Sequence, residues 1–329
     1  MQQFHCHQEK IIARLIFMIS VWLFSFAAIA SSNAKPNVDV GIYVNNIRAI
    51  SYKNDSYVAD ITLWFRWDDP KIHPEKTFKI ANAKIDSKKE VFNGLIEGTK
   101  TRHAIVDVTA TIDTKWDIKN FPFDQQRLTI KVEENEDDDT VKMYRVDSNN
   151  ITTHPIEIPG WKITGERSYV TSNHYDTNFG DPSGDPSVSK SFNSTQFNYE
   201  IDIKKKSTLI GFKLLIAPIV AILLMSVVLR LPASESPRMG VATTSLFALV
   251  SSSYIITGQL PDSEGFSFAE KLITFGLIQC AIYLTETVAS LKYAKSDNPE
   301  MSQQIDKRLF WFLMLSNLLF MLYALTIIF

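Results

Sequence analysis

Hydrophobic and polar positions follow different patterns in two parts of the chain. Between residues 40 and 205, short segments alternate apolar and polar side chains and are rich in β-branched and aromatic residues. This period of two is typical of β-strands that bury one face. Turn-forming pairs such as Asp69-Pro70 and Pro159-Gly160 separate the segments, and no convincing helical period is present. The pattern predicts an all-β sandwich, with strands within residues 40–47, 57–67, 104–112, 126–132, 161–170 and 197–203.

Four apolar segments dominate the rest of the chain. They cover residues 209–229, 239–260, 268–291 and 309–329. Each is close to the roughly 20 residues that an α-helix needs to cross the hydrocarbon layer of a membrane. We therefore predict two domains, a β-sandwich over residues 31–206 and a four-helix transmembrane bundle over residues 207–329.

The second apolar segment is rich in hydroxyl groups, with seven Ser and Thr residues. A helix that faces only lipid gains no stabilisation from so many hydroxyl groups. Helical spacing collects one mostly small and hydroxylated stripe, which is typical of a helix that lines water on one face. In the alternative interpretation, the hydroxyls bond to carbonyls of their own helix or hold helices together. We call this set the pore stripe: Gly240, Thr244, Phe247, Ser251, Ile255 and Gly258.

The N-terminus has the features of a secretory signal peptide. Lys10 and Arg14 precede an apolar stretch that ends in Ala28-Ile29-Ala30, a small-x-small cleavage pattern. This predicts a signal over residues 1–30, with an uncleaved anchor as the alternative. Residues 230–238 and 292–308 hold six Lys and Arg residues, whereas the loop after the second segment offers only Lys271. The positive-inside rule then predicts a multi-pass protein of the plasma membrane, with the sandwich and the C-terminus outside.

Composition and charge narrow the function further. The net charge of −2 gives no indication of nucleic-acid binding. Cys6 lies in the predicted signal and Cys280 in an apolar segment, so we expect the exported domain to be held by its core without a disulfide. Zinc-type spacing, a phosphate-binding glycine loop and a supported Ser/His/Asp arrangement are missing from the sequence. We therefore expect neither an enzyme nor a resident cofactor.

The segment from Thr114 to Leu128 contains a motif of six residues at fixed spacing. It resembles the signature loop of pentameric ligand-gated ion channels, the Cys-loop receptor superfamily. Animal members have cysteines at both ends of this loop, where Thr114 and Leu128 stand here, so the chain resembles the prokaryotic branch without the disulfide. The motif residues are Asp117, Phe121, Pro122, Phe123, Asp124 and Gln126.

Further similarities to this family extend over nearly all of the mature chain. They are Trp67-Asp68-Asp69, Gly160-Trp161, Pro218 in the first apolar segment, and Arg238 with Leu260-Pro261 around the second. Three features differ from the family pattern. A Trp-x-Pro stretch is missing near residues 78–86, Phe247 replaces the more usual Leu or Ile, and no acidic ring marks the inner mouth of the pore. The agonist, and the choice between cations and anions, therefore stay open.

The resemblance implies a homopentamer with the second helix around a central pore. Phe247 would form an apolar ring halfway down the pore and Ile255 a second ring nearer the outside, and such rings close channels sterically or by dewetting. The implied function is a ligand-gated ion channel. Its partners would be four identical subunits, a small-molecule agonist or a proton, permeant ions and membrane lipid. The alternatives are a non-conducting ligand-binding receptor of the same fold and a membrane-anchored exported enzyme.

The resemblance also implies a contact that couples the two domains. The apolar turn Phe121-Pro122-Phe123, which we call the coupling turn, would rest on the loop that joins the second and third helices and includes Pro261. Opposite charges beside it, Asp117 and Asp124 against Lys204, would bias the packing. In the alternative interpretation, the lysines around residue 204 only hold the chain at lipid headgroups.

In the same family, ligands bind between neighbouring sandwiches, where aromatic side chains often surround a cation. The corresponding regions of this chain also contain six acids within residues 133–139, which repel one another unless they are solvated or bind a cation. Clustered oxygens suit Ca²⁺, and a solvated acidic turn is the alternative. The candidate ligand residues are Trp64, Arg66, Glu133, Tyr175, Phe179 and Phe192, and the candidate Ca²⁺ ligands are Glu134, Glu136 and Asp138.

Overall fold

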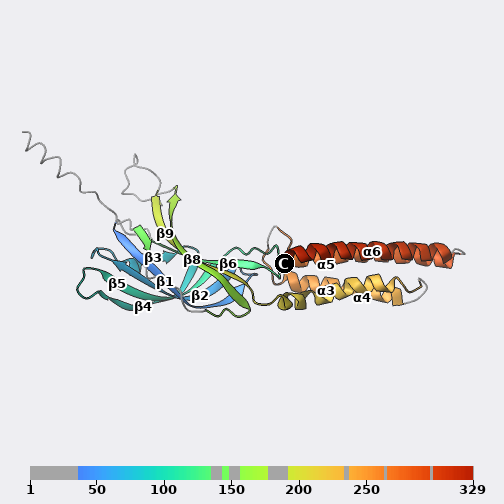
Figure 1. Ribbon diagram of the computed structural model, residues 1–329, viewed down its shortest axis with the longest axis horizontal. Coiled ribbons are helices and arrows are strands. Elements are labelled where there is room, and N and C mark those ends of the chain that lie inside the picture. Colours follow the sequence, from blue (N-terminus) through green and yellow to red (C-terminus); the bar gives the residue numbers. More distant parts are fainter. Residues whose placement is uncertain are drawn as a thin grey trace, which may run out of the picture. The chain divides into compact units, whose positions relative to one another are not determined.

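The computed structural model describes residues 36–134, 143–147, 156–176, 192–232, 237–262, 265–296 and 299–328. The predicted signal peptide lies outside these described residues. The described part contains nine strands, one four-residue helix and four long helices (Figure 1). The strands come first and the long helices follow, which confirms the division into a β-rich part and a helical part.

The nine strands form two sheets. The strands are β1 Asn37–Ser51, β2 Ser56–Trp67, β3 Phe78–Ile80, β4 Ala83–Leu95, β5 Arg102–Asp113, β6 Gln125–Glu134, β7 Met143–Val146, β8 Trp161–Tyr175 and β9 Phe192–Lys205, and the short helix α2 is Pro74–Thr77. The five-stranded sheet has the order β4-β5-β2-β1-β7, and the four-stranded sheet has the order β3-β6-β9-β8. β1 and β7 run parallel, whereas β1 and β2 and the pairs of the four-stranded sheet are antiparallel.

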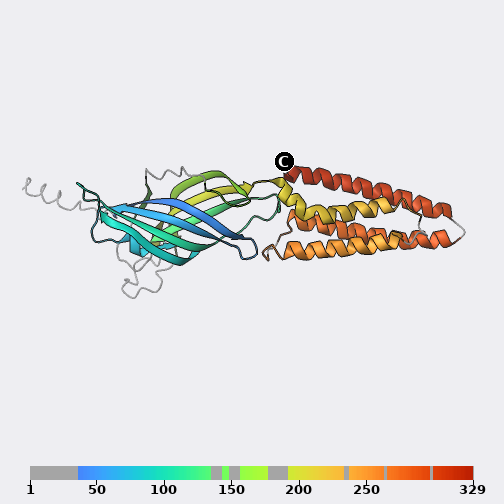
Figure 2. The same ribbon diagram turned by 90° about the horizontal axis from the view of Figure 1, so that it is seen from below.

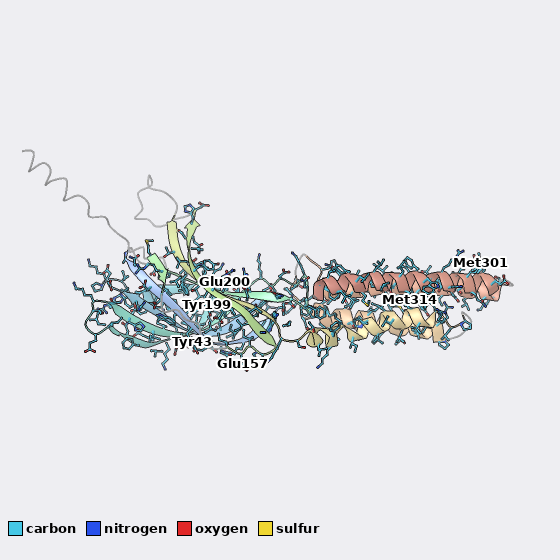
Figure 3. The ribbon with its side chains drawn as sticks, in the orientation of Figure 1. Tyr43, Glu157, Tyr199, Glu200, Met301 and Met314 are labelled. Atoms are coloured by element: carbon cyan, nitrogen blue, oxygen red, sulfur yellow. The ribbon has the colours of Figure 1, made fainter. Side chains whose placement is uncertain are left out.

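Side chains alternate between the two faces of each sheet. Buried and half-buried positions alternate along the whole of β2. In β9, Tyr199 is buried in the core, whereas Glu200 lies on the opposite face and forms an ion pair with Arg167 (Figure 3). Because a strand directs successive side chains to opposite faces, each sheet presents one apolar face to the core of the sandwich.

The six segments predicted as strands all lie within observed strands. The sequence pattern does not predict β3, β4 or β7. β4 is an edge strand, and most of its residues are exposed on both faces. It therefore has no apolar face to produce an alternating pattern, and only its pairing with β5 defines it as a strand.

The four long helices are α3 Thr208–Val228, α4 Pro237–Thr257, α5 Phe268–Lys295 and α6 Pro299–Ile328. α3 begins just after β9 ends, and the side chain of Ser207 caps it by accepting a hydrogen bond from the N–H of Leu209 at 3.2 Å. α5 ends at residue 295 instead of the predicted 291, and α6 begins at residue 299 instead of 309. Hydropathy detects only the apolar part of a helix, whereas the backbone hydrogen bonds continue through its polar turns.

The helices pack side by side (Figures 1 and 2). α4 packs against α3 and α5, and Gly276 of α5 permits this close approach, because a Cβ atom there would lie 2.8 Å from Leu249 and 3.0 Å from Ile222. α6 is covered least, with 6% of its apolar segment buried against 28 to 39% for the other three. All four helices are long and apolar enough to cross a membrane, so the chain is a multi-pass membrane protein.

Candidate functional site

α4 has one buried face and one exposed face. Five of the six residues of the pore stripe are exposed, among them Phe247 at 75% and Ile255 at 57%, while Ser251 is half-buried. The opposite face packs against α3 and α5. Its buried residues, at helical spacing, are Ala242, Ser245, Leu249, Ser252 and Ile256.

The hydroxyl groups of α4 have two kinds of partner. Thr243 and Thr244 donate to the carbonyls one turn earlier in their own helix, at 3.1 and 2.9 Å. The buried Ser245 donates instead to the carbonyl of Ala221 in α3 at 3.3 Å. The O–H groups of the two threonines therefore fit the alternative interpretation, in which hydroxyls bond to carbonyls of their own helix. Each hydroxyl oxygen still keeps acceptor lone pairs on the exposed face, and hydrocarbon offers no donor to them.

A buried ion cluster that the hydropathy pattern does not predict lies at the start of α4. Arg238 is fully buried and donates to both carboxylate oxygens of Asp306 in α6, at 2.9 and 3.1 Å. It also donates to Glu286 of α5 at 3.2 Å. Ser290 donates to Asp306 at 2.7 Å, and the hydroxyl of Tyr283 donates to the carbonyl of Arg238 at 3.2 Å. This cluster connects the first turn of α4 to α5 and α6.

The sequence contained one signal for this cluster. An acid within a long apolar segment, such as Glu286, is costly in a membrane and usually pairs with a cation. Its partner could not be read from the sequence, because Arg238 lies 48 residues away and Asp306 lies 68 residues from Arg238.

The coupling turn contacts the beginnings of two helices. The ring of Phe123 lies 5.3 Å from that of Phe212 in α3 and 6.0 Å from that of Phe268 in α5, centroid to centroid. The N–H groups of Phe268 and Ala269 donate to the carbonyls of Lys119 and Phe121, at 2.9 and 3.2 Å. The turn therefore packs against the residues that follow the loop containing Pro261. Residues 263–264 of that loop lie outside the described residues.

The acids beside the coupling turn are bound within the sandwich. Asp124 is buried and accepts hydrogen bonds from the hydroxyl of Tyr52 and, at 2.6 Å, from the amide of Gln126. Gln126 also donates to the backbone carbonyl of Asp117 at 2.8 Å. Among the ion pairs in the described part of the chain, none joins Asp117 or Asp124 to Lys204. The expected opposite-charge contact with Lys204 is not formed by these residues: the neutral donors Tyr52 and Gln126 both bond one oxygen of Asp124, and its other oxygen is buried without a hydrogen-bond partner.

The basic residues before α3 are arranged differently from this expectation. Lys204 is exposed, whereas the ammonium of Lys205 lies 3.7 Å from the ring centroid of Trp161. Burial lowers the pKa of Lys205, and the charge of Asp124 opposes this shift. The pair that does reach the loop between α4 and α5 is Lys53 with Asp262, next to Pro261, at 3.4 Å.

Trp64 and Arg66, two of the candidate ligand residues, meet at an acid that the sequence did not indicate. Both lie on β2, and both donate to the carboxylate of the buried Asp147, the indole N–H of Trp64 at 2.8 Å. Asp147 directly follows β7, a strand that only the structure defines. Trp64 also lies against Gly41, where a Cβ atom would collide with its ring.

Glu133 lies on the other sheet. The core of β6 contains Leu128, Ile130 and Val132, so Glu133 faces the opposite side of the strand. It is nevertheless buried, and it accepts hydrogen bonds from the amide groups of Asn173 on β8, at 2.5 Å, and Gln196 on β9. Within one chain, Glu133 and the pair Trp64 and Arg66 therefore belong to different sheets.

The remaining ligand candidates are only partly described. Tyr175 and Phe192 pair across β8 and β9 through their backbones, but their side chains lie outside the described residues, as does Phe179. The structure therefore does not show whether these aromatic groups surround a cation.

The acidic run is not a single solvated turn. Glu134 ends β6 and accepts a hydrogen bond from the hydroxyl of Tyr144 at 3.0 Å, and burial together with this acid raises the pKa of Tyr144. Glu136 and Asp138 lie outside the described residues. In the described part of the chain, no group of three acids, histidines or cysteines is placed to hold a metal ion. Ca²⁺ binding at the run stays a prediction.

A comparison with models of known protein families finds no match, and a comparison with curated proteins finds none either. The resemblance to pentameric channels therefore stays an expectation from the sequence, and the structure adds only the order of a β-rich part before four long helices.

Proposed function

We propose that this chain is one subunit of a prokaryotic-type pentameric ligand-gated ion channel. The observation that carries the proposal is the exposed hydroxylated face of α4, a helix long enough to span a membrane. Lipid is a poor neighbour for this face, because the hydroxyl oxygens find no donors there. Copies of the chain arranged around an axis would turn the face toward water, and the family resemblance suggests five copies.

The sandwich supports contacts between copies as well. The edge strand β4 exposes three large apolar side chains, Val91 at 54%, Phe92 at 46% and Leu95 at 61%. Exposed apolar groups on an edge strand favour association with another chain. In such an assembly, Trp64 and Arg66 of one subunit would face the region around Glu133 of the next, and a ligand would bind between them.

Ligand binding would act on the pore through the base of the sandwich. The coupling turn contacts the first turns of α3 and α5, which flank the buried face of α4. A ligand that binds the open state more tightly than the closed state would shift the equilibrium by that difference in affinity. Rings of Phe247 and Ile255 would close the pore in the other state.

A second function is a ligand-binding receptor of the same fold that does not conduct. The observation that favours it is the position of two large apolar groups, Phe247 and Ile255, on the same exposed face as the hydroxyls. Such rings can keep a narrow pore dry. An exported enzyme with a membrane anchor has weaker support, because an anchor has no need for a hydroxylated helix face.

Two measurements on the full chain test the proposal. Five copies of the 37.4 kDa chain give about 187 kDa before signal removal, which mass measurement in mild detergent can detect. A stable monomer or dimer with an intact fold would contradict the channel. Ion flux into liposomes, screened over ligands and pH, separates a channel from a non-conducting receptor.

A further inference from the structure

The buried ion cluster at the start of α4 leaves one hydrogen-bond donor of its arginine unused. The guanidinium of Arg238 has N–H groups on Nη1, Nη2 and Nε. Those on Nη1 bond the carbonyl of Leu231 at 3.3 Å and a carboxylate oxygen of Asp306 at 2.9 Å. Those on Nη2 bond the other oxygen of Asp306 at 3.1 Å and Oε2 of Glu286 at 3.2 Å. The N–H on Nε is buried and has no hydrogen-bond partner in the described part of the chain.

The unused acceptor of the cluster belongs to the same ion pair. Glu286 accepts from Arg238 through Oε2, while its Oε1 is buried without a hydrogen-bond partner among the described residues. In a side-on pair, Nε and Nη2 of an arginine bond the two oxygens of one carboxylate. Such a pair would join the two unused atoms. The contact between Arg238 and Glu286 is therefore half formed.

Asp306 has a second donor besides Arg238. Ser290 on α5 donates to Oδ1 of Asp306 at 2.7 Å, and the hydroxyl oxygens of Ser290 and Ser302 lie 2.7 Å apart. A buried acceptor that keeps one hydrogen bond loses less than an acceptor left with none. The guanidinium could therefore turn toward Glu286, satisfy both unused atoms and leave Asp306 bonded to Ser290.

We propose that Arg238 is a conformational switch with two arrangements. In the α6-paired arrangement, which the structure describes, Nη1 and Nη2 hold both oxygens of Asp306. In the α5-paired arrangement, Nε and Nη2 hold both oxygens of Glu286, and Asp306 retains the hydroxyl of Ser290. Packed elements change state through such discrete alternatives and do not deform continuously.

The switch lies next to the pore stripe. Gly240, the first residue of the stripe, follows Arg238 by two positions, and the hydroxyl of Tyr283 on α5 donates to the carbonyl of Arg238 at 3.2 Å. An exchange of carboxylates would therefore move the first turn of α4 relative to α5 and α6. The effect on a pore rests on the proposed function, whereas the exchange of partners does not.

The test compares variants of the purified full-length protein. Cryo-electron microscopy in lipid nanodiscs measures the distance from Nε of Arg238 to the side chain at position 286. Asp306→Asn removes the charge that holds the guanidinium on α6, and Glu286→Gln removes the charge that would draw it to α5. The matched control is Thr287→Val, because Thr287 follows Glu286 in the chain, is buried with an unpaired side-chain oxygen and carries no charge.

We expect Asp306→Asn to bring Nε of Arg238 to about 3 Å from an oxygen of Glu286. The wild-type protein and Glu286→Gln should keep the guanidinium on Asp306. Basal ion flux into liposomes should change in opposite directions in the two variants, with about a tenfold difference between them. Thr287→Val should match the wild-type protein in both measurements.

Two results would overturn the proposal. The first is a structure of Asp306→Asn in which Nε of Arg238 stays unpaired, and the second is flux that changes in the same direction in Asp306→Asn and Glu286→Gln. A lack of flux in every protein, the wild type included, would contradict the channel alone, and microscopy would still decide between the two arrangements.

Thermal unfolding identifies any variant that has lost its fold. If Asp306→Asn does not fold, Ser290→Ala replaces it, because this substitution removes the donor that Asp306 needs in the α5-paired arrangement. Ser290→Ala should then change flux in the same direction as Glu286→Gln. An opposite change, or none, would overturn the proposal.

Discussion

α4 and α6 both expose much of their surface and both expose large apolar side chains, but the exposed face of α4 also carries threonine hydroxyls in its middle turns. Along α6, the exposed residues are large and apolar, such as Trp311 at 60%, Leu315 at 57% and Leu319 at 58%. Along α4, exposed threonines such as Thr243 and Thr244 lie beside apolar groups. An apolar exposed surface suits lipid, whereas a hydroxylated one suits water or another protein surface. The hydroxyl groups on its exposed face therefore favour a different neighbour for α4 than for α6.

The two helices also differ in how they are held. α4 packs closely against α3 and α5 through small residues, while α6 reaches α4 through the polar contact between Asp306 and Arg238. We therefore expect substitutions in the ion cluster to lower stability most. Substitutions in the close packing should lower it less, and substitutions on the exposed face of α4 should lower it least.

The largest effect is expected for Arg238→Gln. The substitution leaves Asp306 and Glu286 buried without their cation, which should cost about 3–5 kcal/mol of stability. Thermal unfolding in detergent measures the loss. Lys292→Gln, an exposed cation on α5, is the control and should change stability by about 0.5 kcal/mol or less. Equal melting temperatures for the two variants would show that the cluster does not hold α4 to α6.

A smaller effect is expected for Gly276→Ala. The added methyl group meets the side chains of Leu249 on α4 and Ile222 on α3 at 3.0 Å or less, so these side chains must move, at a cost of about 1–3 kcal/mol. The matched control is Gly240→Ala on the exposed face of α4, where no atom lies within 4 Å of the new methyl group. Helix propensity should make this control neutral or stabilising by about 0.5–1 kcal/mol. The same unfolding experiment compares both variants, and a tolerated Gly276→Ala would contradict the close packing.

Phe247→Ala should hardly change stability, because the side chain is 75% exposed in one chain. If five copies enclose a pore, the substitution widens and wets the constriction, and basal ion flux into liposomes should rise. Phe312→Ala removes an equally large side chain from the exposed face of α6 and should leave flux unchanged. If flux is unchanged for both variants while assembly is intact, Phe247 does not form the barrier to ions.

The smallest structural change is expected for single cysteine substitutions, whose labelling rates measure the access of water to each exposed helix face. In a Cys280→Ser background, Thr244→Cys should react readily with a charged thiol reagent, whereas Leu315→Cys on α6 should react slowly. A thiol needs water nearby to ionise, and the thiolate is the reactive form. Labelling rates in liposomes provide the measurement. Fast reaction at both positions, or at neither, would eliminate the proposed difference between the two helices.

Local patterns in the sequence anticipated much of this molecule. The period of two in residues 57–67 identified β2, and long apolar runs identified four helices. Five of the six residues that the period of 3.6 grouped into the pore stripe are exposed, but so are Met239, Leu246, Val250 and Tyr254 on other faces of α4. Such patterns are visible in a single segment because each depends on the geometry of that segment alone.

The tertiary structure decided which distant residues meet. Arg238 finds Asp306, Trp64 and Arg66 share Asp147, and the guanidinium of Arg230 lies over Phe310 only because particular elements pack together. The edge strand β4 is defined by its hydrogen bonds to β5, since its exposed faces leave no alternating pattern. Ion pairs and strand pairing depend on the three-dimensional arrangement of segments far apart in the chain, and a period within one segment carries no information about its partner.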